Sequence, residues 1–496
     1  MTTLPWEVCI ILAPFIGGLL AFVGGRRSGR WFFGATVLVV GGGLSALTRE
    51  LWRQGPRAYA LGDWGAPLGI ELYADGLSLL MLLLTALVFI LVSIFSLGLI
   101  KARPVEAEGC ENALFWPLVL FFWGALNALF LSRDVFNLYV TLELLTLSAV
   151  PLITLSGTAS SLAAGLRYLL VALLGSLAYL LGTALFYAVS GSLTLHTLAE
   201  SLDGVGSLSV AAGLMIVGLL LKTALFPLHF WLPAAYAEAP TPVSALLAAL
   251  ATKASFYLLL RLWFELFSFG QELAAAQILG GLGMLAILWG SLLAWRQGRV
   301  KRLLAYSSIA QIGYLFLVFP LMAAWIPAGD GVSLEVPGAW GGLVFLLLSH
   351  GLAKSAMFMS AGCLAQAAGS DQIADLTGIG RQFPVPLFAF ALGGMTLMGL
   401  PPSGGFSSKW LFLKASVESL QWWWVPGMLL GGVLAAGYVF RVLRQALVWD
   451  EDVGPYRVVP RRMQWAAMAM ALLSLALGLC GSWPLDLLAI GYPGGP

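Results

Sequence analysis

Five charged residues interrupt long apolar runs of this sequence, where a helix that only faces lipid would carry aliphatic side chains. They are Glu143, Lys222, Lys253, Lys354 and Lys409. Each costs about 2.5–3.5 kcal/mol at the centre of a membrane helix, so a chain that uses its helices only for packing should avoid them. One acid and four amines in this setting predict an ion or proton pathway through the interior.

Two histidines are candidates for the same pathway. His350 lies one turn before Lys354, and His229 lies in a proline-rich segment. For each of the candidates a structural alternative stays open. Either histidine can be a packing residue, Glu143 can be a buried partner of one lysine, and a lysine near a helix end, as Lys409 can be, can extend its ammonium to the lipid headgroups.

Lysine suits proton relay because a buried amine loses the hydration of its charged form, whereas a nearby carboxylate stabilises that form again. Moving Glu143 toward or away from Lys222 would therefore load or release a proton. We treat this pairing as a hypothesis, since the two residues lie on different apolar runs.

The composition places these residues in a membrane protein. Of 496 residues, 60% are hydrophobic and 10% are charged, and the mean hydropathy is +0.91. A soluble fold could not bury so many apolar side chains, which excludes a soluble enzyme, a nucleic-acid binder and a disordered scaffold. The net charge of +2 is close to neutral. We therefore predict an all-α membrane protein.

About fourteen transmembrane helices are predicted, each of roughly 20 residues, joined by links too short for a soluble domain. The apolar runs are 6–23, 33–47, 77–100, 113–131, 134–155, 161–190, 209–226, 242–267, 272–294, 302–325, 341–366, 385–400, 424–447 and 465–487.

Basic residues gather in the odd-numbered loops between these runs. Those of the first, third, ninth and thirteenth loops are Arg26, Arg27, Arg30, Lys101, Arg103, Arg296, Arg299, Lys301, Arg302, Arg441, Arg444, Arg457, Arg461 and Arg462. The exceptions are Arg49, Arg53 and Arg57 in the second loop and Arg133 in the fourth. The positive-inside rule places odd loops in the cytoplasm, so we expect a multi-pass protein of the cell (inner) membrane with both termini outside, in the periplasm where there is one.

Two apolar runs carry helix-breaking residues. Pro227 and Pro233 interrupt the seventh run, and Pro401 and Pro402 precede two glycines in the twelfth. Five spans fit between the breaks, and an odd number gives them opposite orientations, as in inverted-repeat transporters. We predict a three-helix segment (1–110), a first repeat (111–267), a second repeat (268–447) and a C-terminal helix (448–496).

Neither metal nor cofactor chemistry is expected. The four cysteines, Cys9, Cys110, Cys363 and Cys480, are far apart and form no metal-ligand spacing with histidine. No nucleotide-binding or hydrolytic motif is present. We expect a transporter subunit with no catalytic residues of its own.

Several segments resemble one family, the antiporter-like subunits, which comprises the D-type subunit of Mrp-type Na+/H+ antiporters and matching subunits of respiratory complex I and membrane-bound hydrogenases. They are GDWGAPLGIELYADGLSLL (62–80), FPLHFWLPAAYAEAPTPVSALL (226–247), KRLLAYSSIAQIGY (301–314), HGLAKSAMF (350–358) and GLPPSGGFSSKW (399–410). The resemblance covers nearly the whole chain and is weakest at the last span. It implies fourteen helices, two inverted five-helix repeats, and breaks in the seventh and twelfth helices.

The resemblance also implies roles for single residues. Glu143 matches the family's fifth-helix glutamate, Lys222 its seventh-helix lysine and Lys253 its eighth-helix lysine. His350 and Lys354 match the eleventh-helix pair, and Lys409 matches the terminal residue of the polar axis on the twelfth helix. One complex I branch has glutamate at the position of Lys409, which argues against that branch. The lack of a long lateral helix after the last span argues against the largest complex I subunit and the large A-type subunit of Mrp antiporters.

The leading interpretation is a proton-translocating subunit of an Mrp-type cation/proton antiporter, working with other membrane subunits. The alternative is a proton-pumping subunit of a complex I-like or hydrogenase-type redox complex, and a third is a membrane scaffold with vestigial charges. Amines repel cations, so we expect protons to use this subunit and sodium to cross elsewhere in the assembly.

Overall fold

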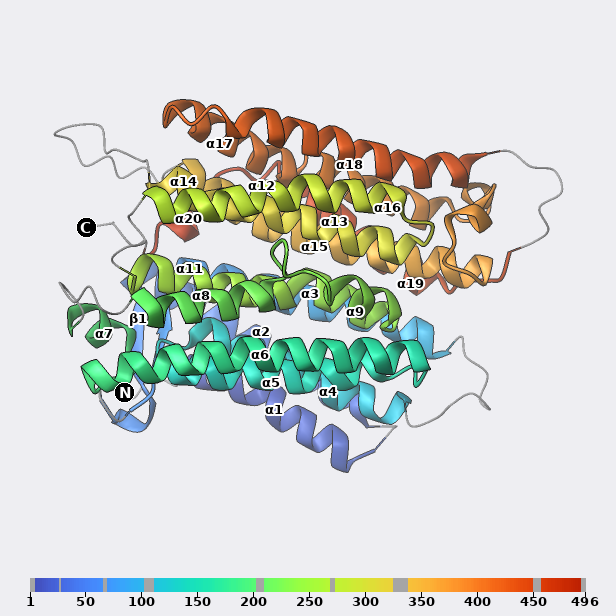
Figure 1. The fold of residues 1–496 in the computed structure, drawn as a ribbon. Coiled ribbons are helices and arrows are strands. Elements are labelled where there is room, and N and C mark those ends of the chain that lie inside the picture. Colours follow the sequence, from blue (N-terminus) through green and yellow to red (C-terminus); the bar gives the residue numbers. More distant parts are fainter. Residues whose placement is uncertain are drawn as a thin grey trace.

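The computed structural model describes residues 5–25, 28–65, 69–101, 111–201, 209–267, 273–323, 338–448 and 456–491. Arg26, Arg27, Arg103 and Cys110 lie outside the described residues, as do parts of the predicted boundaries near 110, 268 and 448. The described chain is nearly all helical (Figure 1).

The N-terminal helices and the first repeat come first along the chain. Their helices are α1 (Trp6–Val23), α2 (Gly29–Gln54), α3 (Gly76–Lys101), α4 (Glu111–Leu131), α5 (Val135–Thr154), α6 (Ala159–Ser190), α7 (Leu195–Ser201), α8 (Ser209–Thr223), α9 (Leu232–Glu238), α10 (Thr241–Leu246) and α11 (Thr252–Glu265).

The helices of the second repeat and the C-terminal part follow. They are α12 (Leu273–Arg296), α13 (Val300–Phe316), α14 (Val318–Ala323), α15 (Gly338–Ala368), α16 (Pro384–Met398), α17 (Gly404–Glu418), α18 (Trp424–Leu447), α19 (Arg461–Ala476) and α20 (Trp483–Leu488).

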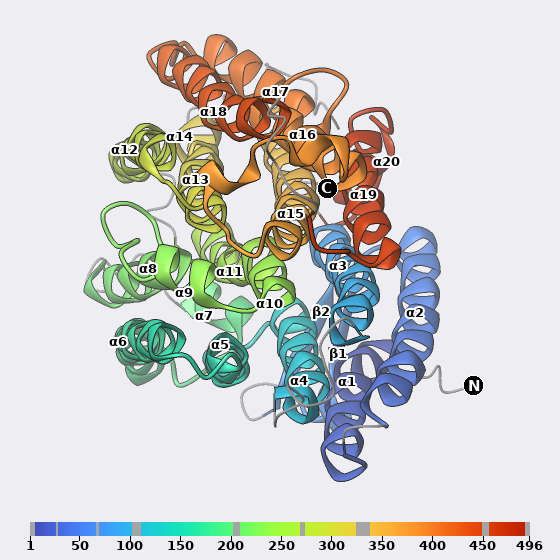
Figure 2. The same ribbon diagram turned by 90° about the vertical axis from the view of Figure 1, so that its right-hand side faces the viewer.

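The predicted membrane fold is confirmed. Among the described residues, 11 helices are long and apolar enough to cross a membrane. Two further crossings are made by the interrupted pairs α8/α9 and α16/α17, and α19 packs beside α3, α15 and α16. Figure 2 shows the bundle end-on, with α15 near its middle. The window of α15 that could span a bilayer is entirely buried by its neighbours.

Both described ends of the chain lie at the same end of the bundle, which we call the terminal end (Figure 1). Glu7 in the first turn of α1 pairs with Arg57 (Nε–Oε1 3.1 Å), and the backbone N–H of Gly76 donates to the carbonyl of Ile490 (2.8 Å). An even number of crossings requires this arrangement. The opposite end of the bundle is called the far end below.

A short β-hairpin at the terminal end was not predicted from the sequence. β1 (Arg57–Ala60) pairs antiparallel with β2 (Glu71–Ala74), and the backbone N–H of Arg133 donates to the carbonyl of Glu71 (3.1 Å). Four-residue strands between two spans carry too little alternation to be recognised. The hairpin covers the ends of the neighbouring helices.

The two predicted helix breaks are present. α8 ends at Thr223 and α9 begins at Leu232. At the break Leu225 bonds to Leu220, so the carbonyl of Leu221 loses its regular i+4 donor and accepts from Ala224 (3.3 Å) and from the indole N–H of Trp231 (2.9 Å). α16 ends before Gly399, whose φ of +80° suits glycine, and α17 begins after the N-cap Ser403. Such breaks are tolerated at membrane depth only where the freed groups find partners.

A third irregularity has no sequence signal. Residues Leu247–Ala251 form a π-helical segment between α10 and α11, so that this crossing is continuous but locally unwound. A π segment leaves backbone carbonyls without their usual i→i−4 donors, and such segments are frequent at functional sites.

Glycine lets α6 and α8 approach closely. A Cβ added to Gly218 would lie 2.3 Å from the carbonyl oxygen of Gly175 on the facing helix. Close approach through small residues is the usual packing mode of membrane helices. The contact lies one turn before Lys222, so it determines how near α8 brings that side chain to α5 and α6.

We expect Gly218→Ala to separate α6 from α8 and to destabilise the protein by about 1–3 kcal/mol, because the added methyl group overlaps a backbone oxygen. Thermal unfolding of the purified protein in detergent measures this. Gly213→Ala is the control, since its Cβ would meet no atom within 4 Å on the same helix. Equal unfolding temperatures for the two variants would contradict the expectation.

Candidate functional site: a line of buried amines

Glu143 and Lys222 form an ion pair between α5 and α8. The Lys222 Nζ atom lies 3.2 Å from Glu143 Oε1 and also donates to Thr146 Oγ1 at 3.2 Å, and Ser176 donates to the same carboxylate oxygen. The Lys222 side chain is 7% exposed and that of Glu143 is 18% exposed. Lys222 lies in the last turn of α8, so the ion pair sits directly beside the helix break.

Lys253 is fully buried in the first turn of α11. Its Nζ atom donates to the carbonyl oxygen of Ala248 at 3.0 Å, within the π-helical segment. The segment thus provides the oxygen that stabilises this ammonium in an apolar interior.

His350 and Lys354 lie one turn apart on α15. Lys354 Nζ donates to the carbonyl of Leu304 at 2.9 Å and to the Ser307 hydroxyl, both on α13. His350 is 1% exposed, and neither ring nitrogen has a hydrogen-bond partner among the described residues. The charges of Lys253, Lys354 and Lys409 act electrostatically on His350. The imidazole is therefore within electrostatic reach of amines on α11, α15 and α17.

Lys409 lies on α17, just beyond the second break. Its Nζ atom donates to the carbonyl oxygens of Leu397 (2.7 Å) and Met398 (3.2 Å) at the end of α16, and it lies 4.5 Å from the ring centroid of Tyr314. Gln311 donates to the same Leu397 oxygen at 3.2 Å. The break thus binds its own lysine through neutral oxygens and an aromatic face.

The helices that carry these residues follow one another across the bundle. In Figure 2, α5 and α8 lie on one flank, α11 and α15 near the middle, and α17 on the other flank. Of the seven predicted pathway residues, only Glu143 and Lys222 touch each other directly. His229 lies in the loop between α8 and α9, where its ring stacks on Phe226 (centroids 5.7 Å apart). Its role stays a prediction.

A second buried ionic cluster lies near the terminal end and was missed in the sequence. Arg261 of α11 donates to Asp75 (Nη2–Oδ1 2.5 Å), to Glu265 (Nη1–Oε1 2.9 Å) and to the Tyr257 hydroxyl (3.0 Å). Asp75 and Arg261 are buried, and Arg133 extends the cluster to Glu265 (3.6 Å). The arginine inside the apolar run 242–267 was the available signal, but its partner lies 186 residues away.

Within the described ranges, no group of three or more His, Cys, Asp or Glu side chains is arranged to hold a metal ion. Hydrogen-bonded amines, one carboxylate and one imidazole are groups that carry protons. Such an arrangement can transfer protons between neighbouring sites over short distances, where water molecules or small motions of the side chains connect one site to the next.

Fold and site together define a multi-pass membrane protein with two interrupted helices and a line of buried amines between them. The chain belongs to the family described as "NADH:quinone oxidoreductase/Mrp antiporter, TM", which matches residues 132–435. The expected resemblance to the antiporter-like subunits is confirmed.

Individual relatives come from both branches of that family. The chain is 35% identical to the N-type subunit of the NADH-quinone oxidoreductase of Desulforudis audaxviator, over 83% of this chain and 79% of the relative. It is 28% identical to the D-type subunit of the Na(+)/H(+) antiporter of Bacillus subtilis, over 88% of this chain and 86% of the relative. A chain in the structure of the Mrp complex from Dietzia sp. DQ12-45-1b has a TM-score of 0.86 at 23% identity, covering 98% of this chain and 96% of that one, which shows the shared fold.

Removing the Arg261 guanidinium should destabilise the protein strongly. In Arg261→Gln the Asp75 carboxylate loses its charged partner while buried, and we expect a loss of about 3–5 kcal/mol in the free energy of unfolding. Denaturation of the purified protein measures it. The double variant Arg261→Gln/Asp75→Asn should be less destabilised than the single one, because no unpaired buried charge is left; additive losses would contradict a direct pairing.

Proposed function

We propose that this chain is the proton-translocating subunit of a multisubunit Mrp-type monovalent cation (Na+)/proton antiporter and works together with other membrane subunits. The observation that carries the proposal is the Glu143–Lys222 ion pair beside the break between α8 and α9. A buried salt bridge is weak evidence for a purely stabilising role. Placed beside a break in a membrane helix, it is a group whose charge state can follow a motion of α8.

The first transfer step follows from electrostatics. An ammonium in a low-dielectric interior is stable only while an anion or several oxygen atoms compensate it. With Glu143 at 3.2 Å, Lys222 holds its proton; if α8 withdraws Lys222 from the carboxylate, the amine loses that stabilisation and releases the proton. In this account Glu143 sets the charge state of Lys222, and Lys222 delivers the proton.

The later steps use the remaining amines. The proton passes from Lys222 toward Lys253, then to His350 and Lys354, and leaves through Lys409. Support for this order comes from the sequence of helices α8, α11, α15 and α17 across the bundle and from the electrostatic interaction of His350 with three lysines. His229 is placed by this proposal at the opening of the first half, in the loop of the break.

The repeats 111–267 and 268–447 are proposed to provide two half-channels that are not equivalent. In the first, Lys222 is held by the carboxylate of Glu143. In the second, the ligands of Lys409 are the neutral oxygens of Leu397 and Met398 and the ring of Tyr314. We therefore place the carboxylate-dependent step in the first repeat. Sodium is proposed to cross elsewhere in the assembly, since lysine ammonium groups repel cations; sodium bound beside Glu143 would contradict this.

Orientation follows from the charged loops. The far end carries Arg296, Arg299, Arg302, Arg441 and Arg444 in or beside its loops. The positive-inside rule assigns this end to the cytoplasm and the terminal end to the outside of the cell (inner) membrane.

Neutralising the first pair should abolish proton-coupled transport. We expect Glu143→Gln and Lys222→Gln each to reduce the initial rate at least about a hundredfold, because the proton donor or the group that sets its charge is lost. The rate is measured as sodium-dependent dissipation of a pH gradient in inverted membrane vesicles that contain the whole complex, normalised to complex content.

Glu418→Gln is the matched control. Glu418 is an exposed acid on α17 that pairs with exposed Lys414 (3.6 Å), so its loss should leave the rate within about twofold of wild type. Full transport in both Glu143→Gln and Lys222→Gln would remove the proposed function.

The second candidate function is a proton-pumping subunit of a redox-driven membrane complex. It is favoured by the 35% identity to a quinone oxidoreductase subunit, which exceeds the 28% identity to an antiporter subunit. The same vesicles distinguish the two: a pH gradient dissipated by added sodium supports antiport, whereas acidification that requires NADH, ferredoxin or a quinone supports the redox complex. Sodium without effect, together with redox-driven acidification, would replace the leading proposal.

A further inference from the structure

Arg299 joins two carboxylates at the far end of the bundle. Its Nη1 atom lies 2.7 Å from Glu238 Oε1, and its Nε atom lies 2.9 Å from Asp371 Oδ2 and 3.0 Å from Oδ1. Glu238 ends α9 in the first repeat, whereas Asp371 follows α15 in the second. A single guanidinium fork therefore bridges the two repeats.

Backbone contacts reinforce the same junction. The N–H of Val300 donates to the carbonyl of Asp371 (2.9 Å), and the N–H of Ile373 donates to the carbonyl of Gly298 (2.8 Å). Lys301 Nζ donates to the carbonyl of Ala239 at 2.7 Å, just before α10. The junction thus links the start of α10, the start of α13 and the end of α15.

These three elements lead to the central amines or bind them. α10 continues through the π segment into α11 with Lys253, and α15 carries Lys354, which bonds to Leu304 and Ser307 of α13. Sliding α15 by one turn along α13 would break both the Lys354 bonds and the Arg299–Asp371 bonds. The charges of Lys253 and Lys354 also act on each other, so their separation matters energetically.

The guanidinium is permanently charged in this setting. Burial alone would lower the pKa of Arg299, but its hydrogen bonds and charge interactions with Glu238 and Asp371 raise the pKa above its ordinary value. Arginine is the side chain best suited to such a bridge, because its planar fork presents several donors to two carboxylates at once.

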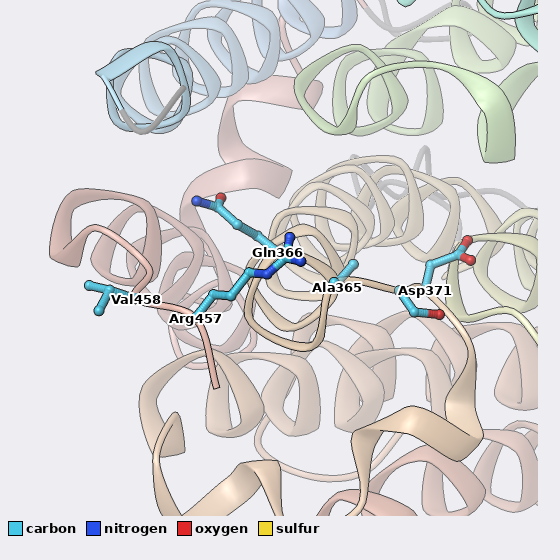
Figure 3. Close-up of a pocket in the computed structure, with 7 residues that line it drawn as sticks. Ala365, Gln366, Asp371, Arg457 and Val458 are labelled. Carbon is cyan, nitrogen blue, oxygen red and sulfur yellow. The ribbon is translucent and has the colours of Figure 1, made fainter. Parts of the chain in front are cut away.

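Asp371, one of the two carboxylates that Arg299 bridges, borders a cavity. Asp371, together with Gln366, Ser370 and Arg457, lines a cavity of about 460 Å³ at the end of α15 (Figure 3). In the figure, Arg457 reaches across the end of α15, and its guanidinium lies against Gly369. Asp371 thus lies at the edge of this cavity, whereas its carboxylate is bonded to Arg299.

We propose that Arg299 is a positioning residue for proton transfer between the repeats: by bridging Glu238 and Asp371 it holds Lys253 and Lys354 at the separation across which the proton passes. This inference rests on the proposed function. It assigns a role in transport to an arginine at the membrane end, remote from the line of amines itself.

The test compares three variants of the whole complex in the vesicle assay. Transfer rates fall steeply when reacting groups are misplaced by about 1 Å, so Arg299→Gln should lower the maximal rate at least about tenfold at unchanged complex content. The half-saturating proton and sodium concentrations should not change. Arg299→Lys, whose single ammonium can hold one carboxylate, should retain an intermediate rate. Arg296→Gln, which removes the same charge from an exposed side chain at the same end, should stay within about twofold of wild type.

The second measurement is the energetic coupling between Arg299 and each of its two carboxylate partners, Glu238 and Asp371. Glu238→Gln and Asp371→Asn should each lower the maximal rate, and neither should lower it further in the Arg299→Gln background, since the bridge is already lost. A wild-type rate in Arg299→Gln overturns the inference, as does a loss that only follows reduced complex content. If Arg299→Gln transports normally while Glu143→Gln does not, this inference fails alone; if Glu143→Gln also transports normally, the proposed function fails with it.

Discussion

An ammonium group inside a bilayer must have oxygen partners, and two irregularities of the fold provide them. A regular helix uses its own carbonyl groups for internal hydrogen bonds. At two of the three irregularities a carbonyl binds a lysine: Ala248 in the π segment binds Lys253, and Leu397 before the second break binds Lys409. At the first break the indole of Trp231 binds the carbonyl of Leu221 instead. At these two sites the irregular backbone and the buried amine stabilise each other, whereas Lys354 uses a carbonyl oxygen of the uninterrupted helix α13.

Lys222 differs from the other three amines because its partner carries a charge. The carboxylate of Glu143 stabilises the ammonium and makes its protonation depend on the distance between α5 and α8, while the Gly175–Gly218 contact holds α8 close to α6. The amines held only by carbonyl or hydroxyl oxygens lack such a switch. In the proposed path the proton binds first at Lys222, on one flank of the bundle, and then passes to amines that neutral ligands hold. The two halves of the path therefore differ in chemistry.

Much of this architecture could be predicted from the sequence, because charged residues within apolar runs and Pro–Gly breaks are visible in single segments. The segment LAALA (247–251) contains only good helix formers, so its π conformation cannot be read from residue types. It depends on tertiary packing and on the hydrogen bond from Lys253 to Ala248. The partners of Lys354 and Lys409 include backbone carbonyls, which no residue type reveals. The ionic clusters around Arg261 and Arg299 join residues that are far apart in the chain, so the partners of each arginine can be identified only in the folded structure.

The central claim is that a hydrated interior path joins the amines across the bundle. A high-resolution cryo-EM map of the assembled complex, with ordered water visible, tests it most directly. The account predicts water molecules bridging the gaps from Lys222 to Lys253 and from Lys354 to Lys409, with each ammonium turned toward the bundle interior. Dry, apolar packing in those gaps, or ammonium groups turned toward the lipid headgroups, would contradict it.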